Sequence, residues 1–155
     1  MLVSQANISL ALLGLFRVST AKSLACIPNT WLNLALIPTP RQEHNTIAID
    51  DTTIAVVGGS MLIGNIFNTT DVLQFYDITS NTWCNMSPIP YKVNHPKVAV
   101  VDGKLYLLGG LINGPKILSA SINRVAPTHC YVYDPAADVW RGLEPMMNGT
   151  ERGCA

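Results

Sequence analysis

Residues 97–110 read KVAVVDGKLYLLGG, and residues 46–59, which lie 51 positions earlier, read TIAIDDTTIAVVGG. The two stretches match without a gap, and both end in a Gly-Gly pair. Each holds two short apolar runs around a central turn, which favours a pair of antiparallel strands. Asp102-Gly103 suits a two-residue turn because both residues adopt positive φ readily, whereas Asp51-Thr52 in the earlier copy is a costlier choice. A hairpin that recurs along the chain predicts a repeat architecture.

A second motif recurs 57 positions apart. Residues 76–83 read YDITSNTW and residues 133–140 read YDPAADVW, so a Tyr-Asp pair is followed by five residues and a Trp in both. The Trp also opens the match between WLNLALIP at 31–38 and WCNMSPIP at 83–90. We expect a second hairpin between each Tyr and the following Trp, which gives four strands for each repeat unit.

Glycine and aromatic residues at fixed places in the unit suit packing between sheets. Glycines lack a Cβ and let neighbouring backbone approach closely, while Tyr and Trp can fill the wedge between twisted sheets. We therefore assign structural roles to Trp31 and to Gly58, Gly59, Tyr76, Trp83, Gly109, Gly110, Tyr133 and Trp140.

With these motifs the chain resembles kelch-repeat proteins, and more closely the secreted fungal proteins of the galactose oxidase/kelch superfamily. The resemblance rests on PRQEH (40–44), VVGG (56–59), NHPKVAVVDGKLYLLGGL (94–111), YVYDPAADVW (131–140) and GTERGCA (149–155). It implies an all-β fold, a kelch-type β-propeller. The resemblance implies little about activity, because propellers host many functions.

The propeller is expected to be incomplete, with about two four-stranded blades and the start of a third across residues 31–155. The repeat units are placed at about 31–83, 84–140 and 141–155. Because kelch propellers close with more blades, we expect the remaining blades or self-association to cover the open blade faces. The chain alone is expected to be marginally stable or to aggregate.

The first 25 residues are predicted to be a secretory signal peptide. Residues 8–16 (ISLALLGLF) form an apolar run too short to span a bilayer, and small residues before Ala21 and Ala25 offer two cleavage sites. The segment before the run contains no Lys or Arg, and the alternative is a buried strand. We expect a secreted, extracellular protein.

Cysteine and asparagine usage fits that compartment. An even number of cysteines allows up to two disulfides in three connectivities that the sequence does not rank, among Cys26, Cys84, Cys130 and Cys154. Their spacing matches no zinc site, and we expect no metal and no cofactor. Asn68 and Asn148 are predicted glycosylation sites.

Charge limits the partners. Ten basic and ten acidic side chains are scattered singly, so no basic stripe is available for a nucleic acid or an acidic membrane surface. We expect no nucleic-acid partner and no membrane span, and consider an extracellular carbohydrate or protein as the ligand.

Strand order predicts which loops share one rim of the propeller. In an antiparallel blade, the loops 38–44, 91–95 and 147–152 should emerge on the same side as the loops 60–70 and 111–128, which we call the insertions. They gather a speculative ligand-binding set of Arg41, Glu43, His44, Asn94, His95, Glu151 and Arg152. The alternative is that the arginines bridge blades to carbonyl groups and the histidines make structural hydrogen bonds.

No residue identifies a reaction, so we assign no catalytic residue and expect a binding or scaffold module rather than an enzyme. The alternative is a fragment of a propeller enzyme. A copper radical oxidase would need tyrosine and histidine ligands, and no such set can be placed around His44, His95 and His129. A sugar epimerase or mutarotase would need an acid and a base, for which Glu43 and His44 form the only adjacent pair on the rim.

Overall fold

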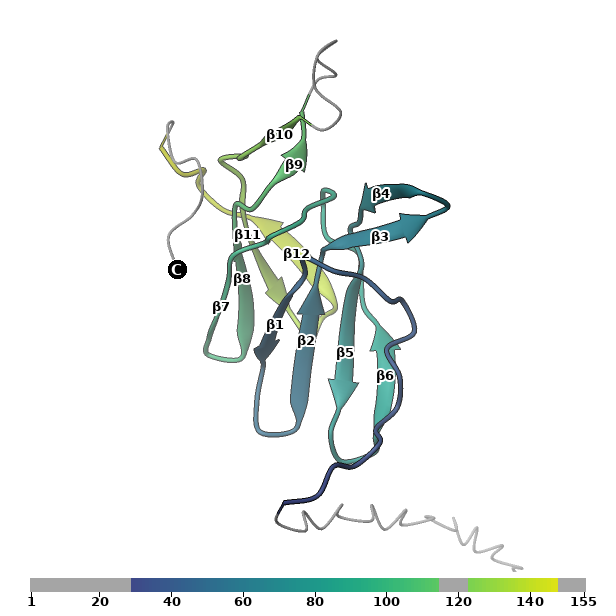
Figure 1. Ribbon diagram of the computed structural model, residues 1–155. Helices are drawn as coiled ribbons and strands as arrows, with labels where there is room; N and C mark the ends of the chain where they lie inside the picture. The colour runs from purple at the N-terminus through teal and green to yellow at the C-terminus, as the bar shows by residue number, and fades with distance from the viewer. Residues whose placement is uncertain (1–28, 115–122, 148–155) are drawn as a thin grey trace, which may run out of the picture.

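The computed structural model describes residues 29–114 and 123–147. Within these ranges the chain forms twelve β-strands and no helix, and two four-stranded antiparallel sheets stand side by side (Figure 1). The first blade has the order β1-β2-β5-β6, with β1 Asn45–Ala48, β2 Thr53–Val57, β5 Leu73–Asp77 and β6 Thr82–Asn85. The second blade has the order β7-β8-β11-β12, with β7 Val98–Val101, β8 Lys104–Leu108, β11 Cys130–Asp134 and β12 Val139–Gly142. The expected four-stranded kelch-type blades are confirmed.

The first hairpins of the two blades differ by one residue in the length of their connecting turns. Asp102 and Gly103 make the two-residue turn with φ of 50° and 70°, so Val101 pairs with Lys104. In the first blade the amide of Ile49 donates to the carbonyl of Thr53 at 2.8 Å, which leaves a three-residue loop.

The gapless sequence match therefore does not extend to the register of the innermost strand. Val56 pairs with Thr46, whereas Leu107, which lies 51 positions after Val56, pairs with Val98. The physical reason is the turn: Asp50 accepts a hydrogen bond from the amide of Thr52 at 2.8 Å, and this Asx turn needs one more residue than the Asp-Gly turn.

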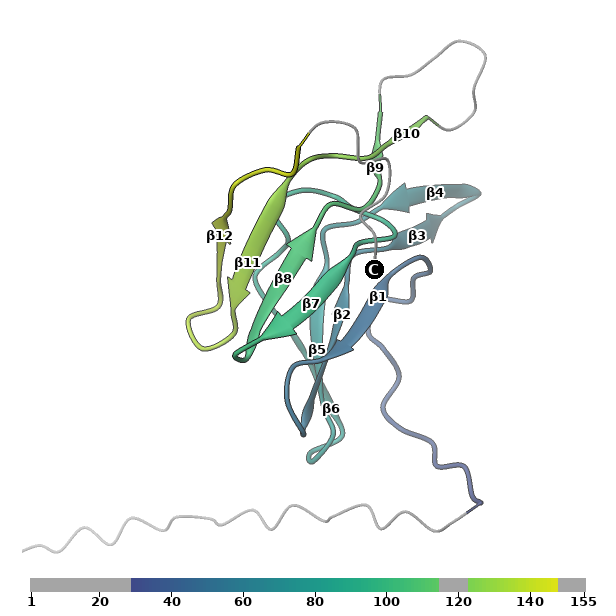
Figure 2. The same cartoon turned by 90° about the vertical axis from the view of Figure 1, so that its left-hand side faces the viewer.

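Two further hairpins extend from the same end of the blades, between the second and third strand of each (Figures 1 and 2). They are β3 (Ser60–Ile63) with β4 (Ile66–Thr69), and the short β9 (Ile112–Asn113) with β10 (Arg124–Val125). The expectation that residues 60–70 form a loop is wrong, because the apolar runs on either side of Gly64-Asn65 pair as strands. The described ends of the 111–128 insertion also pair.

The hydrophobic core lies between the two blades, where β1 runs beside β7. The ring of Phe75 meets that of Tyr133 edge to face, with centroids 5.9 Å apart. Each fully buried aliphatic side chain there contributes about 1.5–3 kcal/mol relative to an exposed one. The core is formed by Ala55, Val57, Leu73, Phe75, Val93, Leu105, Leu107 and Tyr133.

The first Gly-Gly pair lies against the backbone of other segments, whereas the nearest neighbours of Gly109 and Gly110 are side chains. Gly59 has φ of 110°, and a Cβ there would lie 2.6 Å from the carbonyl oxygen of Gln42. Its amide donates to the carbonyl of Val93 at 2.8 Å, across to the segment that enters the second blade. Only glycine meets both requirements without strain.

The Tyr and Trp of each blade form part of a repeated hydrogen-bonding unit that we call a latch. In the first latch, Asn81 Oδ1 accepts hydrogen bonds from the Tyr76 hydroxyl at 2.7 Å and from the amide of Ala35 at 2.8 Å. The indole Nε1 of Trp83 donates to the carbonyl of Ala35 at 2.9 Å. The rings of Tyr76 and Trp83 pack with centroids 5.0 Å apart.

The second latch repeats these contacts on the linker between the blades. Asp138 Oδ1 accepts hydrogen bonds from the Tyr133 hydroxyl and from the amide of Ser87, the latter at 2.8 Å. Trp140 Nε1 donates to the carbonyl of Ser87 at 3.0 Å. The latch thus joins the outer hairpin of a blade to the segment that precedes the blade.

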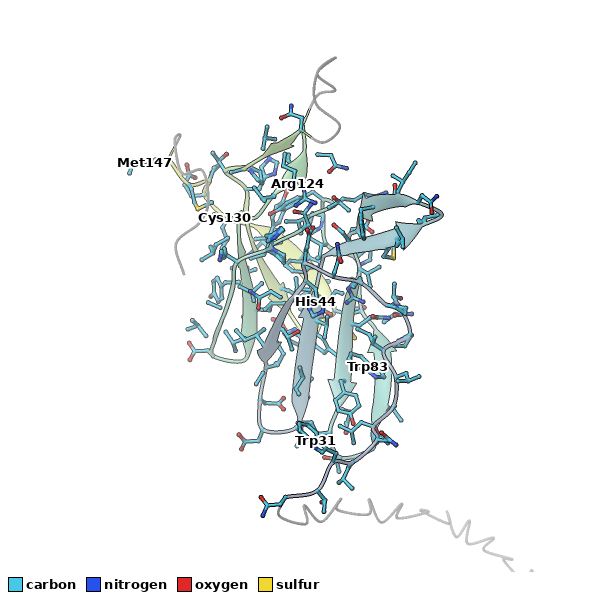
Figure 3. The ribbon with its side chains drawn as sticks, in the orientation of Figure 1. Trp31, His44, Trp83, Arg124, Cys130 and Met147 are labelled. Atoms are coloured by element: carbon cyan, nitrogen blue, oxygen red, sulfur yellow. The ribbon has the colours of Figure 1, made fainter. Side chains whose placement is uncertain are left out.

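Trp31 does not fill a wedge as expected. Its side chain is fully exposed, at the end of the first blade opposite the β3–β4 hairpin (Figure 3). We call residues 29–41 the strap. The strap forms no strand beside the first blade, and the isolated bridge between Gln42 and Ser60 lies just after it. Trp31 therefore has no sheet to pack against.

Several sequence predictions concern residues outside the described ranges. These are the signal peptide at 1–25, the cysteines Cys26 and Cys154, the sequon at Asn148, and the rim residues Glu151 and Arg152. Among the described cysteines, the exposed Cys84 and the buried Cys130 are free thiols. A search of the described residues finds no helix with the length and apolar character needed to cross a membrane.

Candidate functional site

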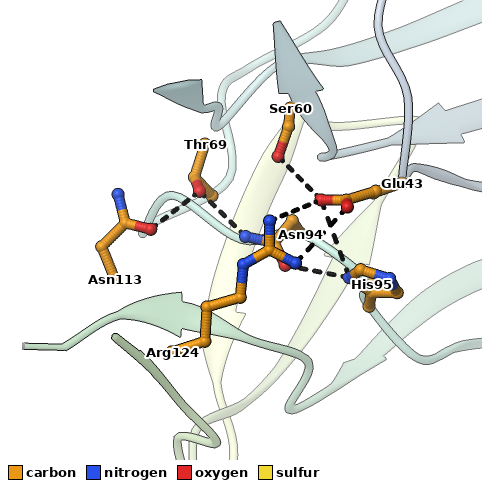
Figure 4. A network of polar contacts seen from close by, with 7 residues as sticks. All are labelled: Glu43, Ser60, Thr69, Asn94, His95, Asn113 and Arg124. Atoms are coloured by element: carbon orange, nitrogen blue, oxygen red, sulfur yellow. Dashed lines mark hydrogen bonds and ion pairs between the residues drawn. The ribbon is translucent and has the colours of Figure 1, made fainter. Parts of the chain in front are cut away.

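A network of polar side chains lies between the two insertion hairpins (Figure 4). Its members come from the segments that lead into the two innermost strands and from the hairpins themselves. They are Glu43, Ser60, Thr69, Asn94, His95, Asn113 and Arg124.

The charged half of the network centres on Glu43. Arg124 contacts both carboxylate oxygens through its two terminal nitrogens, at 3.0 and 3.4 Å. The hydroxyl of Ser60 donates to Glu43 Oε2 at 3.1 Å, and His95 Nδ1 lies 3.9 Å from the same oxygen. About a quarter of the Glu43 and Arg124 side chains remains exposed, and almost half of His95. The ion pair is therefore held by neighbours yet open to a ligand.

Glu43 and His95 occupy equivalent places in the two blades. Each precedes the innermost strand of its blade, with φ of 59° and 48°. The amide of His95 donates to the carbonyl of Glu43 at 2.7 Å, which stacks the two segments on each other. The repeat thus places one acidic and one imidazole side chain together at this end of the molecule.

The neutral half of the network consists of the buried Asn94 and Thr69 and the exposed Asn113. Asn94 is fully buried; its Nδ2 donates to the hydroxyl of Thr69 at 2.9 Å, and that hydroxyl donates to Asn113 Oδ1 at 3.1 Å. Asn94 Oδ1 lies 3.0 Å from His95 Nδ1. Backbone hydrogen bonds between Asn94 and Leu111, at 2.8 and 2.9 Å, fix the segment. This half fixes the ends of the two hairpins that adjoin the blades, while the charged half is open to solvent.

Arg41 lies outside the network. Its guanidinium donates to three carbonyl groups, those of Gly58, Thr39 and Val56, at 2.8 to 3.0 Å, and to Gln74 Oε1. Burial lowers the pKa of Arg41 to about 10, so the side chain stays charged at neutral pH. These contacts pin the strap to the first blade.

His44 is also separate from its neighbour Glu43. The exposed His44 ring contacts the Thr46 hydroxyl at 3.2 Å, while the Glu43 carboxylate contacts Ser60, His95 and Arg124. Partial burial, and then the charge of Arg41, lower the pKa of His44 below its usual value, so the ring is neutral at pH 7. The two side chains are not paired as an acid and a base.

Sequence reasoning missed four members of the network: Ser60, Thr69, Asn113 and Arg124. All lie in the two insertions that were expected to border the rim, but no motif marks them. Arg124 and Glu43 are 81 positions apart, so their pairing depends on how the two blades pack.

An exposed apolar surface adjoins the network. The first and last residues of the β3–β4 hairpin, Ser60 and Thr69, belong to the network. The hairpin carries no charged residue between positions 60 and 70. Cross-strand pairing places Leu62 with Phe67 on one face of the hairpin and Ile63 with Ile66 on the other. All four side chains are 47% to 68% exposed. We call this element the apolar hairpin.

The described residues bring together no group of three His, Cys, Asp or Glu side chains that could hold a metal ion. The three histidines have separate surroundings: His44 contacts Thr46, His95 belongs to the network, and the His129 ring packs on Tyr91 with centroids 5.2 Å apart.

Comparison with known proteins identifies relatives that match most of this chain. The Kelch motif family model matches residues 94–147. Kelch-like protein terF of Aspergillus terreus is 39% identical over 130 residues, which cover 83% of this chain and 27% of that protein. Kelch-like protein 22 of Rattus norvegicus is 31% identical over 119 residues, or 76% of this chain and 17% of that protein. The chain thus spans at most about a quarter of the length of these relatives.

Two solved structures share the fold. The structure of YjhT aligns with a TM-score of 0.60 and 18% identity over 76% of this chain and 42% of that one. A fungal alcohol oxidase of the AA5 family, in complex with copper, aligns with a TM-score of 0.53 and 15% identity over 69% of this chain and 23% of that one. At these identities the likeness concerns the fold alone. The chain is a kelch-repeat protein, and its described residues form two blades of a kelch-type β-propeller.

Proposed function

We propose that this kelch-repeat chain is a binding module that presents the polar network and the adjoining apolar hairpin to a protein ligand. One observation carries the proposal: the partly exposed Glu43–Arg124 pair and four exposed apolar side chains lie next to each other on two neighbouring hairpins and their linkers. Apolar anchors beside a hydrogen-bonded polar rim are the usual composition of a protein interface.

The apolar hairpin favours a protein over a carbohydrate. A saccharide presents mostly hydroxyl groups, which would leave the exposed Leu62 without an apolar partner. Phe67 is the one aromatic ring on the hairpin, which gives a sugar ring little to stack on. A protein segment can cover the aliphatic side chains and still offer a polar group to Arg124 or Glu43.

We further propose that the protein is secreted and that Asn68 carries a glycan. Asn68 is exposed on β4 and pairs with Met61, so its side chain shares the face of Ile63 and Ile66. A glycan there would shield that face of the apolar hairpin. Leu62 and Phe67, on the opposite face, would remain available to the partner.

Selection of peptides from a phage-displayed library on the full chain tests the proposal. We expect selected peptides to lose at least tenfold in affinity on Phe67→Ser and on Arg124→Gln. Ile66→Ser, on the opposite face of the same hairpin, is the matched control and should change affinity less. Peptides that bind all three variants equally, together with retained saccharides on a glycan array, would contradict the protein-ligand proposal. A secreted product whose mass is unchanged by peptide N-glycosidase would contradict the glycan at Asn68.

A further inference from the structure

An Asn-Gly pair lies at the edge of the polar network. Asn113 is the last residue of β9 and Gly114 follows it, and the sequence holds one other such pair, Asn148-Gly149. In an Asn-Gly pair the amide nitrogen of the glycine can attack the carboxamide carbon of the asparagine, because glycine has no side chain to hinder ring closure. The attacking nitrogen loses its proton, ammonia leaves and a cyclic succinimide forms. Water then opens the ring to aspartate or isoaspartate, so a neutral amide becomes a carboxylate.

The carboxamide of Asn113 takes part in the network through its oxygen. Oδ1 accepts a hydrogen bond from the Thr69 hydroxyl at 3.1 Å, and no hydrogen bond from Nδ2 is formed within residues 29–114 and 123–147. The bond to Oδ1 polarises the carboxamide toward attack by the Gly114 nitrogen. Loss of Nδ2 costs the network no hydrogen bond, and a carboxylate would accept the Thr69 hydroxyl more strongly than an amide does.

Arg124 stands directly opposite Asn113 in the β9–β10 hairpin (Figure 4). The amide of Gly114 donates to the carbonyl of Asn123 at 2.8 Å, which makes Asn113 and Arg124 a non-hydrogen-bonded pair with adjacent side chains on one face. From there the Arg124 guanidinium reaches Glu43 at 3.0 and 3.4 Å. A carboxylate at position 113 would therefore compete with Glu43 for the guanidinium.

The hairpin controls how fast the amide can react. While the Gly114 amide donates to Asn123, its nitrogen is held away from the Asn113 carboxamide. The strands β9 and β10 have only two residues each, and Asn113 and Val125 are exposed. So short a hairpin opens locally far more easily than a blade does. Deamidation is therefore expected from the open hairpin, at a lower rate than in an unfolded chain.

We propose that Asn113 is a deamidation site and that the aspartate product draws Arg124 away from Glu43. A pair of opposite charges then becomes a site with two carboxylates and one guanidinium. The isoaspartate product instead lengthens the backbone of β9 and breaks its register with β10. The consequence for binding rests on the function proposed above: peptides that need Arg124 bind the aspartate form more weakly.

Peptide mass mapping of the aged full chain tests the reaction itself. The chain is kept at neutral pH, folded and in urea, and conversion is followed at Asn113 and at Asn148. We expect Asn113 to convert in both samples, severalfold more slowly in the folded one. No conversion of Asn113 in the folded chain, over a period in which Asn148 converts fully in urea, would overturn the proposal.

The variant Asn113→Asp tests whether the network accepts the product, and Asn94→Asp is the matched control. Asn113 accepts the hydrogen bond of the Thr69 hydroxyl, whereas Asn94 donates to that hydroxyl at 2.9 Å. A carboxylate therefore keeps the contact at position 113 but brings a second acceptor against Thr69 at position 94. We expect Asn113→Asp to keep the urea midpoint of the unmodified chain at neutral pH and Asn94→Asp to lower it clearly. Equal losses would contradict the proposal.

A double-mutant cycle with Arg124→Gln tests the competition without a ligand. Arg124→Gln should lower the urea midpoint more in the Asn113→Asp chain than in the unmodified chain, because two carboxylates then face each other without a cation. Additive losses would overturn the competition for Arg124. Selected peptides give the second measurement: Asn113→Asp should weaken them on the order of tenfold, and not in an Arg124→Gln chain. If no peptide is selected, the proposed function fails, while the mass mapping and the cycle still decide the deamidation proposal.

Discussion

The two blades share one strand order and one latch, yet they differ in what the latch holds. The second blade holds Ser87, in a linker that continues directly from the sheet of the first blade. The first blade holds Ala35, in a strap whose Trp31 is fully exposed. The repeated residues are those that join a blade to the segment before it, whereas turns and insertion hairpins differ between blades. The repeated latch residues thus reflect contacts between a blade and the segment before it rather than the strand propensity of single residues.

The largest loss of stability is expected at a glycine that both blades share and that lies against the backbone of another segment. We predict that Gly59→Ala destabilises the chain by about 3 kcal/mol or more, because φ of 110° disfavours a side chain and the new Cβ would lie 2.6 Å from the Gln42 carbonyl oxygen. Gly64→Ala is the control: φ is 61° but no atom lies within 4 Å, so the cost should be about 1–2 kcal/mol. Urea denaturation measures both. Equal losses would show that close approach at Gly59 does not matter.

The two latches should differ in their contribution to stability. Trp140→Phe removes the hydrogen bond to Ser87 and part of a ring packed 4.9 Å from Tyr133, and we expect a loss of about 2 kcal/mol in urea denaturation. Trp83→Phe removes the same contact to Ala35, but the loss should be nearer 1 kcal/mol because the strap is little buried. A larger loss at Trp83 would reverse the comparison between the blades.

The innermost hairpins offer a smaller contrast. Gly103→Ala forces a side chain into φ of 70° in open space, so we expect a loss of about 1 kcal/mol. The first blade uses a three-residue loop in which Thr52 donates both its amide and its hydroxyl to Asp50. Thr52→Ala keeps the amide bond and should cost less than Gly103→Ala by the same measurement. The opposite order would mean that the Asx turn depends on the Thr52 hydroxyl.

The parts of the fold that could be predicted are those whose sequence signals act over a few neighbouring residues. Strands Val98–Val101 and Lys104–Leu108 form as expected, because Asp-Gly turn chemistry and apolar runs act over a few residues. The β3–β4 hairpin was not predicted, although Gly64-Asn65 stands between two apolar runs, because these runs lie outside the repeated stretch that ends at Gly59.

The candidate site was predicted in part. Strand order brought Glu43, Asn94 and His95 to one end of the molecule, and the structure joins these three in the network. Arg41 turns to carbonyl groups because its neighbours supply three acceptors in a half-buried place. Arg124 has no signal in the sequence, since its contact with Glu43 exists only once two blades have packed.

The smallest predicted effect concerns the acceptor of each latch, which is neutral Asn81 in the first blade and charged Asp138 in the second. The Tyr133 hydroxyl, and then the amide of Ser87, hold the pKa of Asp138 below its usual value. A lowered pKa in the folded state means that the unfolded chain binds the proton more readily. The stabilising contribution of Asp138 is therefore complete above its unfolded pKa of about 3.9 and is lost as pH falls through the lower folded value.

Asp138→Asn should accordingly flatten the acid side of the stability profile below about pH 4, measured as urea midpoints at a series of pH values. Asn81→Asp should steepen it, because the new carboxylate would accept the same Tyr76 hydroxyl and Ala35 amide that Asn81 Oδ1 accepts now. Asp50, Asp77 and Asp134 also have lowered pKa values from local hydrogen bonds, but they are present in every variant and give a common background. Because each exchange converts one latch into the chemistry of the other, parallel profiles for Asp138→Asn and Asn81→Asp would show that the latch carboxylate does not couple to folding. A flatter profile for Asp138→Asn and a steeper one for Asn81→Asp would show that the two latches share one geometry and differ in the charge of the acceptor.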